Sequence, residues 1–172
     1  MNKKIKLVVI DRDGTLIIDK HYINDPNKVQ LIPGTIPGIK NLINSKILIA
    51  LHTNQSGINR GYFTKEIVHR INLKMIELIG LGKNIFSDIC VAPNIFWNKN
   101  NYRKPSPKFT LELMNKYNLD SKSIAYIGDT SKDKDCAENI GCRFYWLAYQ
   151  NKEKLNCKPY MSLNEIVNHI LN

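Results

Sequence analysis

Hydrophobic residues along this chain gather in short continuous runs that are separated by stretches with helical spacing. Five runs have the length and β-branched content of buried strands: Ile5–Ile10, Ile47–His52, Ile89–Ala92, Ser123–Ile127 and Phe144–Leu147. Amphipathic stretches between and after them predict helices: Pro37–Ser45, a longer helix capped by Thr64, Pro107–Tyr117, Lys134–Ile140 and a final helix that begins with a capping box at Ser162–Glu165. Strands that alternate with helices predict an α/β fold, a Rossmann-like parallel sheet with helices on both faces.

The helical stretches also predict which residues are buried and where the helices begin. Two apolar faces recur at helical spacing: Ile39, Leu42 and Ile43 in the first helix, and Ile67, Ile71, Met75, Ile76 and Leu78 in the second. Ser106 is expected to be the N-cap of the third helix, with Pro107 at its first position. Neither a repeat, a low-complexity linker nor a break in composition divides the chain, so residues 1–172 are interpreted as a single domain.

The charge of the chain is the one unusual feature of its composition. Its 172 residues carry 25 Lys and Arg against 15 Asp and Glu, a formal net charge of +10. Of the basic residues 20 are lysines and only 5 are arginines, the side chain that best reads bases and phosphates. Because these lysines are scattered in a chain that is also rich in Asn and Ile, the charge alone does not indicate a nucleic-acid partner.

Simple sequence features argue against several classes of protein. No apolar stretch approaches the roughly 20 residues that a membrane span requires, and the N-terminus has no pattern of a signal peptide. The four cysteines form no Cys-x-x-Cys pair and have no histidine nearby: Cys90, Cys136, Cys142 and Cys157. They are interpreted as reduced thiols, which favours a cytoplasmic protein without a disulfide framework.

Polar side chains follow the predicted strands at their carboxyl ends, where parallel sheets bind ligands. They are Asp11 and Asp13 after the first strand, Thr53 and Asn54 after the second, Arg103 and Lys104 before the third helix, and Asp129 and Asp133 after the fourth strand. Taken singly, each group also fits an ordinary loop or turn. Together, at successive ends of one sheet, they predict a single polar site.

The residue types in this site favour phosphoryl chemistry. Carboxylates from two strand ends form the kind of oxygen-rich pocket that Mg²⁺ prefers, with positions left for water and a phosphate. Thr53 and Lys104 supply donors for phosphate oxygens. One carboxylate is then free to attack phosphorus and form an aspartyl phosphate.

These motifs resemble those of a known group of enzymes. Asp11-Arg-Asp-Gly-Thr, then a strand-end Thr, then Lys104, then Gly128-Asp-x3-Asp is similar to the motif set of the haloacid dehalogenase (HAD) superfamily of phosphohydrolases. The stretch Thr53-Asn-Gln-Ser-Gly-Ile-Asn-Arg-Gly and the segment Arg103-Lys-Pro-Ser-Pro look like the D-glycero-D-manno-heptose 1,7-bisphosphate phosphatases and the related histidinol-phosphate phosphatases. The resemblance covers essentially the whole chain.

The resemblance implies roles for the aspartates and the metal. Asp11 would be the nucleophile, and Asp13 the general acid and base that protonates the leaving oxygen and then activates water. Asp129 would bind Mg²⁺ together with Asp11 and the backbone carbonyl of Asp13. Asp133 would support that site or orient Lys104.

The resemblance also implies which residues hold the substrate. Thr53 and the backbone of Asn54 would bind the phosphoryl group, and Lys104 would neutralise it. Arg103 would reach the rest of the substrate, a second phosphate included.

The loop before the Arg-Lys pair departs from the pattern of these phosphatases. The resemblance implies a zinc-binding loop with a Cys-x-His pair and a later Cys-x-Cys pair, whereas the corresponding positions here are Ala92, Asn94, Asn100 and Tyr102. Since none of them is a thiolate or an imidazole, we expect no zinc. Three aromatic side chains are expected to pack the loop instead: Phe96, Trp97 and Tyr102.

The spacing of the motifs leaves no room for a cap domain over the site. A loop and one helix account for the residues between Asp13 and Thr53, and a helix and a strand for those between Thr53 and Lys104. We therefore expect an open site, bordered by two specificity loops at residues 19–33 and 94–102.

The expected activity is that of a magnesium-dependent phosphatase for a small phosphorylated sugar. The resemblance favours removal of the 7-phosphate of D-glycero-D-manno-heptose 1,7-bisphosphate; the alternatives are a histidinol-phosphate phosphatase and a polynucleotide 3′-phosphatase. Six basic residues cluster along the chain near the motifs: Lys99, Arg103, Lys104, Lys108, Lys132 and Lys134. Such a cluster would offset the aspartates and attract a doubly anionic small molecule. We expect a monomer with a sugar phosphate rather than nucleic acid as its partner.

Overall fold

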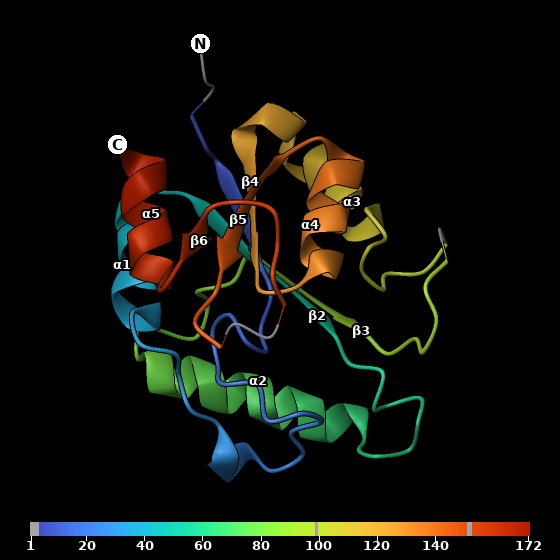
Figure 1. Cartoon of the computed structure of the whole chain (residues 1–172). Coiled ribbons are helices and arrows are strands. Elements are labelled where there is room, and N and C mark those ends of the chain that lie inside the picture. Colours follow the sequence, from blue (N-terminus) through green and yellow to red (C-terminus); the bar gives the residue numbers. More distant parts are fainter. Residues whose placement is uncertain (1–3, 99, 151–152) are drawn as a thin grey trace.

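A single parallel sheet forms the centre of the computed structural model, which describes residues 4–98, 100–150 and 153–172 (Figure 1). In this part of the chain the sheet has six strands in the order β3-β2-β1-β4-β5-β6. Their bounds are β1 Leu7–Ile10, β2 Leu48–Asn54, β3 Asp88–Ala92, β4 Ile124–Gly128, β5 Arg143–Leu147 and β6 Pro159–Tyr160. The predicted fold class is confirmed. The short strand β6 at the edge was not predicted.

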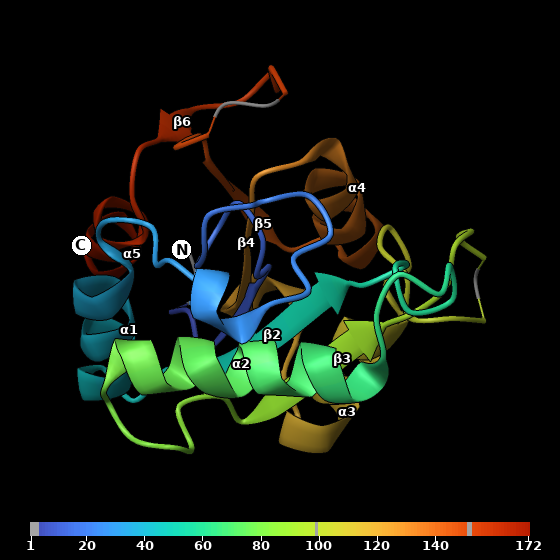
Figure 2. The same cartoon turned by 90° about the horizontal axis from the view of Figure 1, so that it is seen from below.

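Helices cover both faces of the sheet. The α-helices of the described residues are α1 Thr35–Asn44, α2 Lys65–Ile79, α3 Lys108–Tyr117, α4 Ser131–Ile140 and α5 Leu163–Leu171, and two 3₁₀ turns lie at Pro26–Lys28 and Ser121–Ser123. Helices α1, α2 and α5 contribute to one apolar core, and α3 and α4 contribute to the other. Helices α1 and α5 lie side by side, as the two views show (Figures 1 and 2).

Strand β1 divides these two cores because its side chains alternate between the faces of the sheet. Val8 and Ile10 belong to the core under α1, α2 and α5, whereas Leu7 and Val9 belong to the core under α3 and α4. All four are fully buried. The strand pairs with β2 on one side and β4 on the other, so the residue that follows it, Asp11, is attached to an interior strand of the sheet.

Some expected helix faces and boundaries were wrong. Ile43 in α1 and Leu78 in α2 are 40% and 38% exposed, because each lies at the margin of its helix face rather than at its centre. Helix α1 begins at Thr35 after the left-handed Gly34, two residues before the predicted start. Pro107, not Ser106, takes the N-cap position of α3.

The boundary of α4 matters for the site. The helix begins at Ser131, three residues earlier than predicted, and Thr130 and Asp133 form a capping box. Asp133 therefore lies in the first turn of a helix, with a fixed backbone, and not in a loop. Across the described ranges, the helices are all too short or too polar to span a membrane.

Candidate active site

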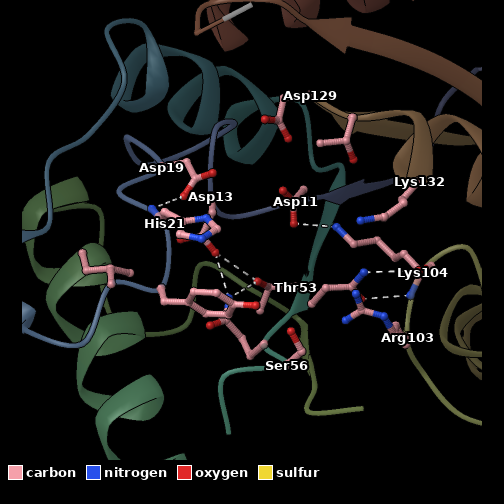
Figure 3. Close-up of a pocket in the computed structure, with 15 residues that line it drawn as sticks. Asp11, Asp13, Asp19, His21, Thr53, Ser56, Arg103, Lys104, Asp129 and Lys132 are labelled. Atoms are coloured by element: carbon pink, nitrogen blue, oxygen red, sulfur yellow. Dashed lines mark hydrogen bonds and ion pairs between the residues drawn. The ribbon is translucent and has the colours of Figure 1, made fainter. Parts of the chain in front are cut away.

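The residues predicted for the site meet at the carboxyl end of the sheet, around a cavity of about 250 Å³ (Figure 3). Seven of the eight line it: Asp11, Asp13, Thr53, Asn54, Arg103, Lys104 and Asp129. They come from β1, β2, β4 and the loop before α3, elements far apart in sequence. The eighth, Asp133, does not line the cavity and is fully buried.

Lys104 is the buried cation of the site. Its ammonium nitrogen lies 2.5 Å from Asp11 Oδ1 and 2.6 Å from Asp133 Oδ1, and the residue is only 3% exposed. Burial opposes the charge of Lys104, but the carboxylates of Asp11 and Asp133 outweigh this effect and raise its pKa. Lys104 therefore remains charged at neutral pH and links the first strand end to α4.

Asp133 holds Lys104 while it caps α4. Its second oxygen, Oδ2, accepts hydrogen bonds from the backbone N–H of Thr130 at 3.1 Å and from the Thr130 hydroxyl at 2.7 Å. Gly128 allows this approach, because a Cβ atom at that position would overlap the carboxyl group of Asp133. Both oxygens of Asp133 are thus engaged, and its contacts fix the position of the Lys104 ammonium.

Burial makes the charged forms of Asp11 and Asp129 energetically unfavourable when no metal ion is bound. Burial raises the pKa of Asp11 to about 7, against the lowering effect of Lys104. Burial, followed by the negative charges of Asp11 and Asp133, raises the pKa of Asp129 to about 9. In addition, Asp129 Oδ1 is buried without a hydrogen-bond partner. A cation between the two carboxylates would remove both penalties.

The residues present fit a magnesium ion. Among the described residues, Asp11, Asp129 and Asp133 form the one group of three acidic, cysteine or histidine side chains whose ligand atoms lie within 4.8 Å of one another. Carboxylate oxygens are the ligands that Mg²⁺ prefers, and it takes few of them because it retains water and phosphate. Asp129 Oδ1 is buried without a hydrogen-bond partner, and a bound cation would supply a partner for it.

The raised pKa values predict how stability depends on pH and Mg²⁺. In the unfolded chain both carboxyls return to a pKa of about 4, so the folded, metal-free protein binds more protons than the unfolded one. The contribution of these two carboxyls to stability is therefore fully present below about pH 4 and is lost as the pH rises to about 7 for Asp11 and to about 9 for Asp129. Mg²⁺ should displace these protons, so its stabilising effect should grow with pH. Thermal unfolding with and without Mg²⁺ from about pH 6 to 9 measures this, and a stabilisation that does not change with pH would contradict it.

Gly14 allows Asp129 to approach the first strand end. It has a φ of +83°, and a Cβ atom there would overlap Asp129 Oδ2. We expect Gly14→Ala to displace the Asp129 carboxyl, to remove stabilisation by Mg²⁺ and to lower kcat/KM by about 100-fold. The matched control is Gly61→Ala, since Gly61 also has a positive φ, +74°, but nothing within 4 Å of the added atom. Equal loss of Mg²⁺ stabilisation in both variants would show that backbone strain alone is responsible.

Asp13 and Thr53 face each other across the cavity floor, and Gln55 joins them. Gln55 Nε2 donates to Asp13 Oδ2 and to Thr53 Oγ1, both at 2.8 Å, and the Thr53 hydroxyl donates to Asp13 Oδ2 at 3.3 Å. Thr53 is fully buried, and Gln55 is nearly so. The side chain of Asp13 is thus held in a fixed orientation by Gln55 and Thr53.

Asn54 positions Lys104 through the backbone of that residue. Its Oδ1 accepts from the Lys104 N–H at 2.9 Å, and its Nδ2 donates to the Lys104 carbonyl at 3.2 Å. The paired hydrogen bonds fasten the loop before α3 to the end of β2. The resemblance implied that the backbone of Asn54 binds the phosphoryl group. The structure adds that its side chain holds the backbone of Lys104.

The first specificity loop contributes a wall of the cavity. Asp19, His21 and Tyr22 line it, and both His21 and Tyr22 have left-handed backbones, with φ of 50° and 58°. The Tyr22 ring packs edge-on against Tyr62. Non-glycine residues in this conformation are uncommon and cluster at functional sites, and these two border the cavity.

The second specificity loop is fastened by hydrogen bonds. The Arg103 guanidinium donates to the Asn94 carbonyl at 2.9 Å, and the Lys108 ammonium donates to the Asn100 carbonyl at 3.1 Å. The Tyr102 hydroxyl donates to Glu112, and the Tyr102 carbonyl contacts the Nε2 atom of the buried His52 at 2.7 Å. The Ala92 carbonyl accepts from the Gln55 N–H at 2.7 Å, so all four positions aligned with zinc ligands take part in hydrogen bonds.

The expectation that three aromatic residues pack this loop was wrong for two of them. Phe96 is 81% exposed and Trp97 is 50% exposed, because the loop contains polar backbone contacts and little apolar surface to receive them. Only Tyr102 packs, with the Lys108 ammonium 4.4 Å above its ring.

The basic residues near the motifs divide into two groups. Arg103, Lys104 and Lys132 line the cavity. Lys108 lies over Tyr102, and Lys134 forms an ion pair with Glu138 within α4, so neither lines the cavity. Lys99 lies outside the described residues.

Three side chains to which the resemblance gave no role support Asp13: Arg12 and Gln55 contact it directly, and Asn72 contacts Arg12. Asn72 could have been noticed in the sequence, because it interrupts the apolar face of α2 between Ile71 and Met75. A polar side chain at a core position of a helix needs a buried partner. The identity of that partner, Arg12, depends on the tertiary structure.

Comparison with known proteins agrees with this geometry. The model of the family described as polynucleotide kinase 3 phosphatase matches residues 6–157. The chain is 33% identical to the D-glycero-beta-D-manno-heptose-1,7-bisphosphate 7-phosphatase of Pasteurella multocida over 74% of this chain and 73% of that one. It is 27% identical to the enzyme of the same name from Bordetella bronchiseptica over 80% and 78%.

The fold is similar to that of a solved phosphatase. The crystal structure of the D,D-heptose 1,7-bisphosphate phosphatase from B. bronchiseptica, complexed with magnesium and phosphate, superposes with a TM-score of 0.83. The match covers 97% of this chain and 98% of that one, at 23% sequence identity. At this identity the likeness concerns the fold.

Proposed function

Because the chain belongs to the polynucleotide kinase 3 phosphatase family of HAD-type phosphatases, we propose that it is a magnesium-dependent phosphoric monoester hydrolase. The proposed substrate is D-glycero-D-manno-heptose 1,7-bisphosphate, which would lose its 7-phosphate. The relatives named for this activity support the substrate. The observation that carries the proposal is the buried Lys104 between Asp11 and Asp133, with Asp129 beside them.

Asp11 is the proposed nucleophile. Its carboxylate attacks the phosphorus, an aspartyl phosphate forms, and the bond from phosphorus to the sugar oxygen breaks. Lys104 holds one oxygen of Asp11 and neutralises the transferred group. In the second step a water molecule attacks the aspartyl phosphate, which releases phosphate and restores Asp11.

Asp13 is the proposed general acid and base. It donates its proton to the leaving sugar oxygen in the first step and takes a proton from water in the second. Thr53 and the backbone of Asn54 bind the phosphoryl oxygens, and Arg103 at the rim is assigned to the second phosphate. This arrangement depends on positioning and charge neutralisation, the main requirements of phosphoryl transfer.

Asp11, Asp129 and the backbone carbonyl of Asp13 are the proposed magnesium ligands, and Asp133 supports them by orienting Lys104. When bound, Mg²⁺ supplies positive charge for the phosphoryl oxygens. We propose that no zinc is used, since the corresponding loop positions are Ala92, Asn94, Asn100 and Tyr102. Metal analysis of the purified protein tests this, and one zinc per chain would overturn it.

We further propose a single domain over residues 1–172, acting as a monomer in the cytoplasm on small molecules. The cavity of about 250 Å³ suits one sugar phosphate. Apart from the 3₁₀ turn Pro26–Lys28, the described parts of residues 11–34 and 93–107, which border the cavity, are loops. A polynucleotide 3′-phosphatase is the second candidate, because the description of the matching family names that activity.

A substrate comparison tests the proposal. With Mg²⁺ present, kcat/KM is measured for the heptose bisphosphate, histidinol phosphate and an oligonucleotide with a 3′-phosphate, with Asp11→Asn as the blank. The expected result is the highest kcat/KM with the heptose bisphosphate and little dependence on salt. A preference for the oligonucleotide that falls steeply with added salt would replace the proposed substrate with nucleic acid.

A further inference from the structure

A completely buried arginine lies between the two aspartates of the first motif and contacts only the second. Arg12 is 0% exposed. Its Nε donates to Asp13 Oδ2 at 3.0 Å, and its NH2 group lies 2.9 Å from the same oxygen and 3.2 Å from Oδ1. The guanidinium therefore approaches both oxygens of the Asp13 carboxylate. A buried charge is costly unless it is paired and hydrogen-bonded, so this contact has a structural reason to persist.

The other end of the guanidinium is fixed to α2. Arg12 NH1 donates to Asn72 Oδ1 at 2.9 Å, and Asn72 is 4% exposed. The fully buried Ile71 and Met75 flank Asn72 on the same helix face. The amide oxygen thus belongs to a rigid part of the molecule, 60 residues away from Arg12 in sequence.

A second buried side chain, Gln55, also holds Asp13. Gln55 donates to Asp13 Oδ2 at 2.8 Å, and Gln55 is 6% exposed. By contrast, the Asp13 side chain is 20% exposed to the cavity. The carboxylate therefore reaches the cavity while buried donors fix its orientation. Among these contacts, the Arg12–Asn72 hydrogen bond joins the residues that lie farthest apart in sequence.

We propose that Arg12 and Asn72 are positioning residues, which act through Asp13 by orienting its carboxylate for proton transfer at the leaving oxygen. This inference rests on the proposed role of Asp13 as general acid and base. Asn72 fixes the guanidinium, and the guanidinium fixes the two carboxylate oxygens. Proton transfer requires a donor within hydrogen-bond distance of the accepting atom, and a displacement of about 1 Å can cost a factor of about 100 in rate.

The proposal makes the rate loss depend on the leaving group. Phenolate leaves poorly unless its oxygen is protonated, whereas p-nitrophenolate leaves without a proton. A misplaced Asp13 should therefore slow the hydrolysis of phenyl phosphate and of a sugar phosphate far more than that of p-nitrophenyl phosphate. General damage to the fold or to the metal site would slow all three to the same extent.

The main variant is Asn72→Leu, which keeps the volume and removes the acceptor. We expect kcat/KM to fall by about 10- to 100-fold for phenyl phosphate and for the heptose bisphosphate, and by less than about threefold for p-nitrophenyl phosphate. Asn72→Asp keeps an acceptor oxygen for Arg12 and should restore phenyl phosphate hydrolysis to within about threefold of the parent. Leu73→Ala, at the neighbouring 52% exposed position of α2, is the control for changes to the helix and should leave all three rates unaltered.

A second measurement places the effect on Asp13. In a protein that already carries Asp13→Asn, the change Asn72→Leu should cause no further loss with phenyl phosphate, because residues that act through one group are not additive. An equal loss with phenyl and p-nitrophenyl phosphate, or a full additional loss in the Asp13→Asn background, would overturn the proposal.

The test still gives an answer if the main variant does not fold or if the heptose bisphosphate is not a substrate. If Asn72→Leu does not fold, Arg12→Lys replaces it, since a single ammonium cannot span both Asn72 and the Asp13 carboxylate, and the same leaving-group dependence is expected. If the parent hydrolyses the aryl phosphates but not the heptose bisphosphate, the proposed substrate fails while the leaving-group comparison still tests Arg12 and Asn72.

Discussion

Asp11→Asn is expected to abolish phosphatase activity, with kcat lowered by a factor on the order of 10⁴ or more. An amide oxygen is too weak a nucleophile to attack phosphorus, and the substitution also removes one charge that faces the proposed magnesium site. The fold should remain, because Lys104 keeps its ion pair with Asp133, 2.6 Å away. Removal of one of three neighbouring carboxylates also relieves the repulsion that helps to raise the pKa of Asp129.

Single-turnover and steady-state assays with the heptose bisphosphate and with p-nitrophenyl phosphate measure this effect, and thermal unfolding measures the stability. Asp135→Asn is the matched control, because Asp135 is an exposed aspartate on α4 outside the cavity. The covalent mechanism would be wrong if Asp11→Asn kept more than about a hundredth of the parent activity with its fold intact.

Lys104→Met is expected to have the largest effect on stability, with a loss of about 3–5 kcal/mol in the free energy of unfolding without metal. Its ammonium lies between Asp11 and Asp133, both buried. Methionine fills a similar volume but leaves these carboxylates without their cation, and burial then drives them to bind protons. Activity should also be lost, because Lys104 is the one side-chain cation in the described residues that forms an ion pair with Asp11, and Mg²⁺ alone would not replace its charge beside the transferred phosphoryl group.

Urea unfolding with and without Mg²⁺ measures this loss. Mg²⁺ should recover part of the stability of Lys104→Met, because it restores positive charge beside Asp11 and Asp129, but it should not recover activity. Lys132→Met is the control, since Lys132 also lines the cavity but is exposed. If Lys104→Met had the same free energy of unfolding as the parent, the ion pairs of Lys104 with Asp11 and Asp133 would make no net contribution to stability.

The residues that could be predicted from sequence are those whose position depends on local pattern. Asp11, Thr53 and Asp129 follow or end apolar runs that are recognisable as strands, and parallel strands bring their carboxyl ends to one edge. The prediction that these side chains share a site therefore needed only the alternation of strands and helices. Their proposed roles came from the resemblance to HAD phosphatases and stay predictions.

The parts that could not be predicted depend on contacts between distant segments. Asp133 was expected to support the metal site or to orient Lys104, and in the structure one of its oxygens accepts from Thr130 and the other from Lys104. The exposure of Phe96 and Trp97 depends on what surface lies beside their loop. The sequence near these residues does not decide between the two expected roles of Asp133 and does not indicate the exposure of Phe96 and Trp97.

The sequence by itself determined five strands of the sheet and the charged residues at their carboxyl ends, because hydrophobic periodicity is a local property of the chain. Only the tertiary structure decided which charges pair. It buried Lys104 between Asp11 and Asp133, left Asp129 Oδ1 without a partner, and joined Arg12 to Asn72 of α2. Ion pairs and buried hydrogen bonds act over a few ångströms, so their energies depend on how segments far apart in sequence are packed together.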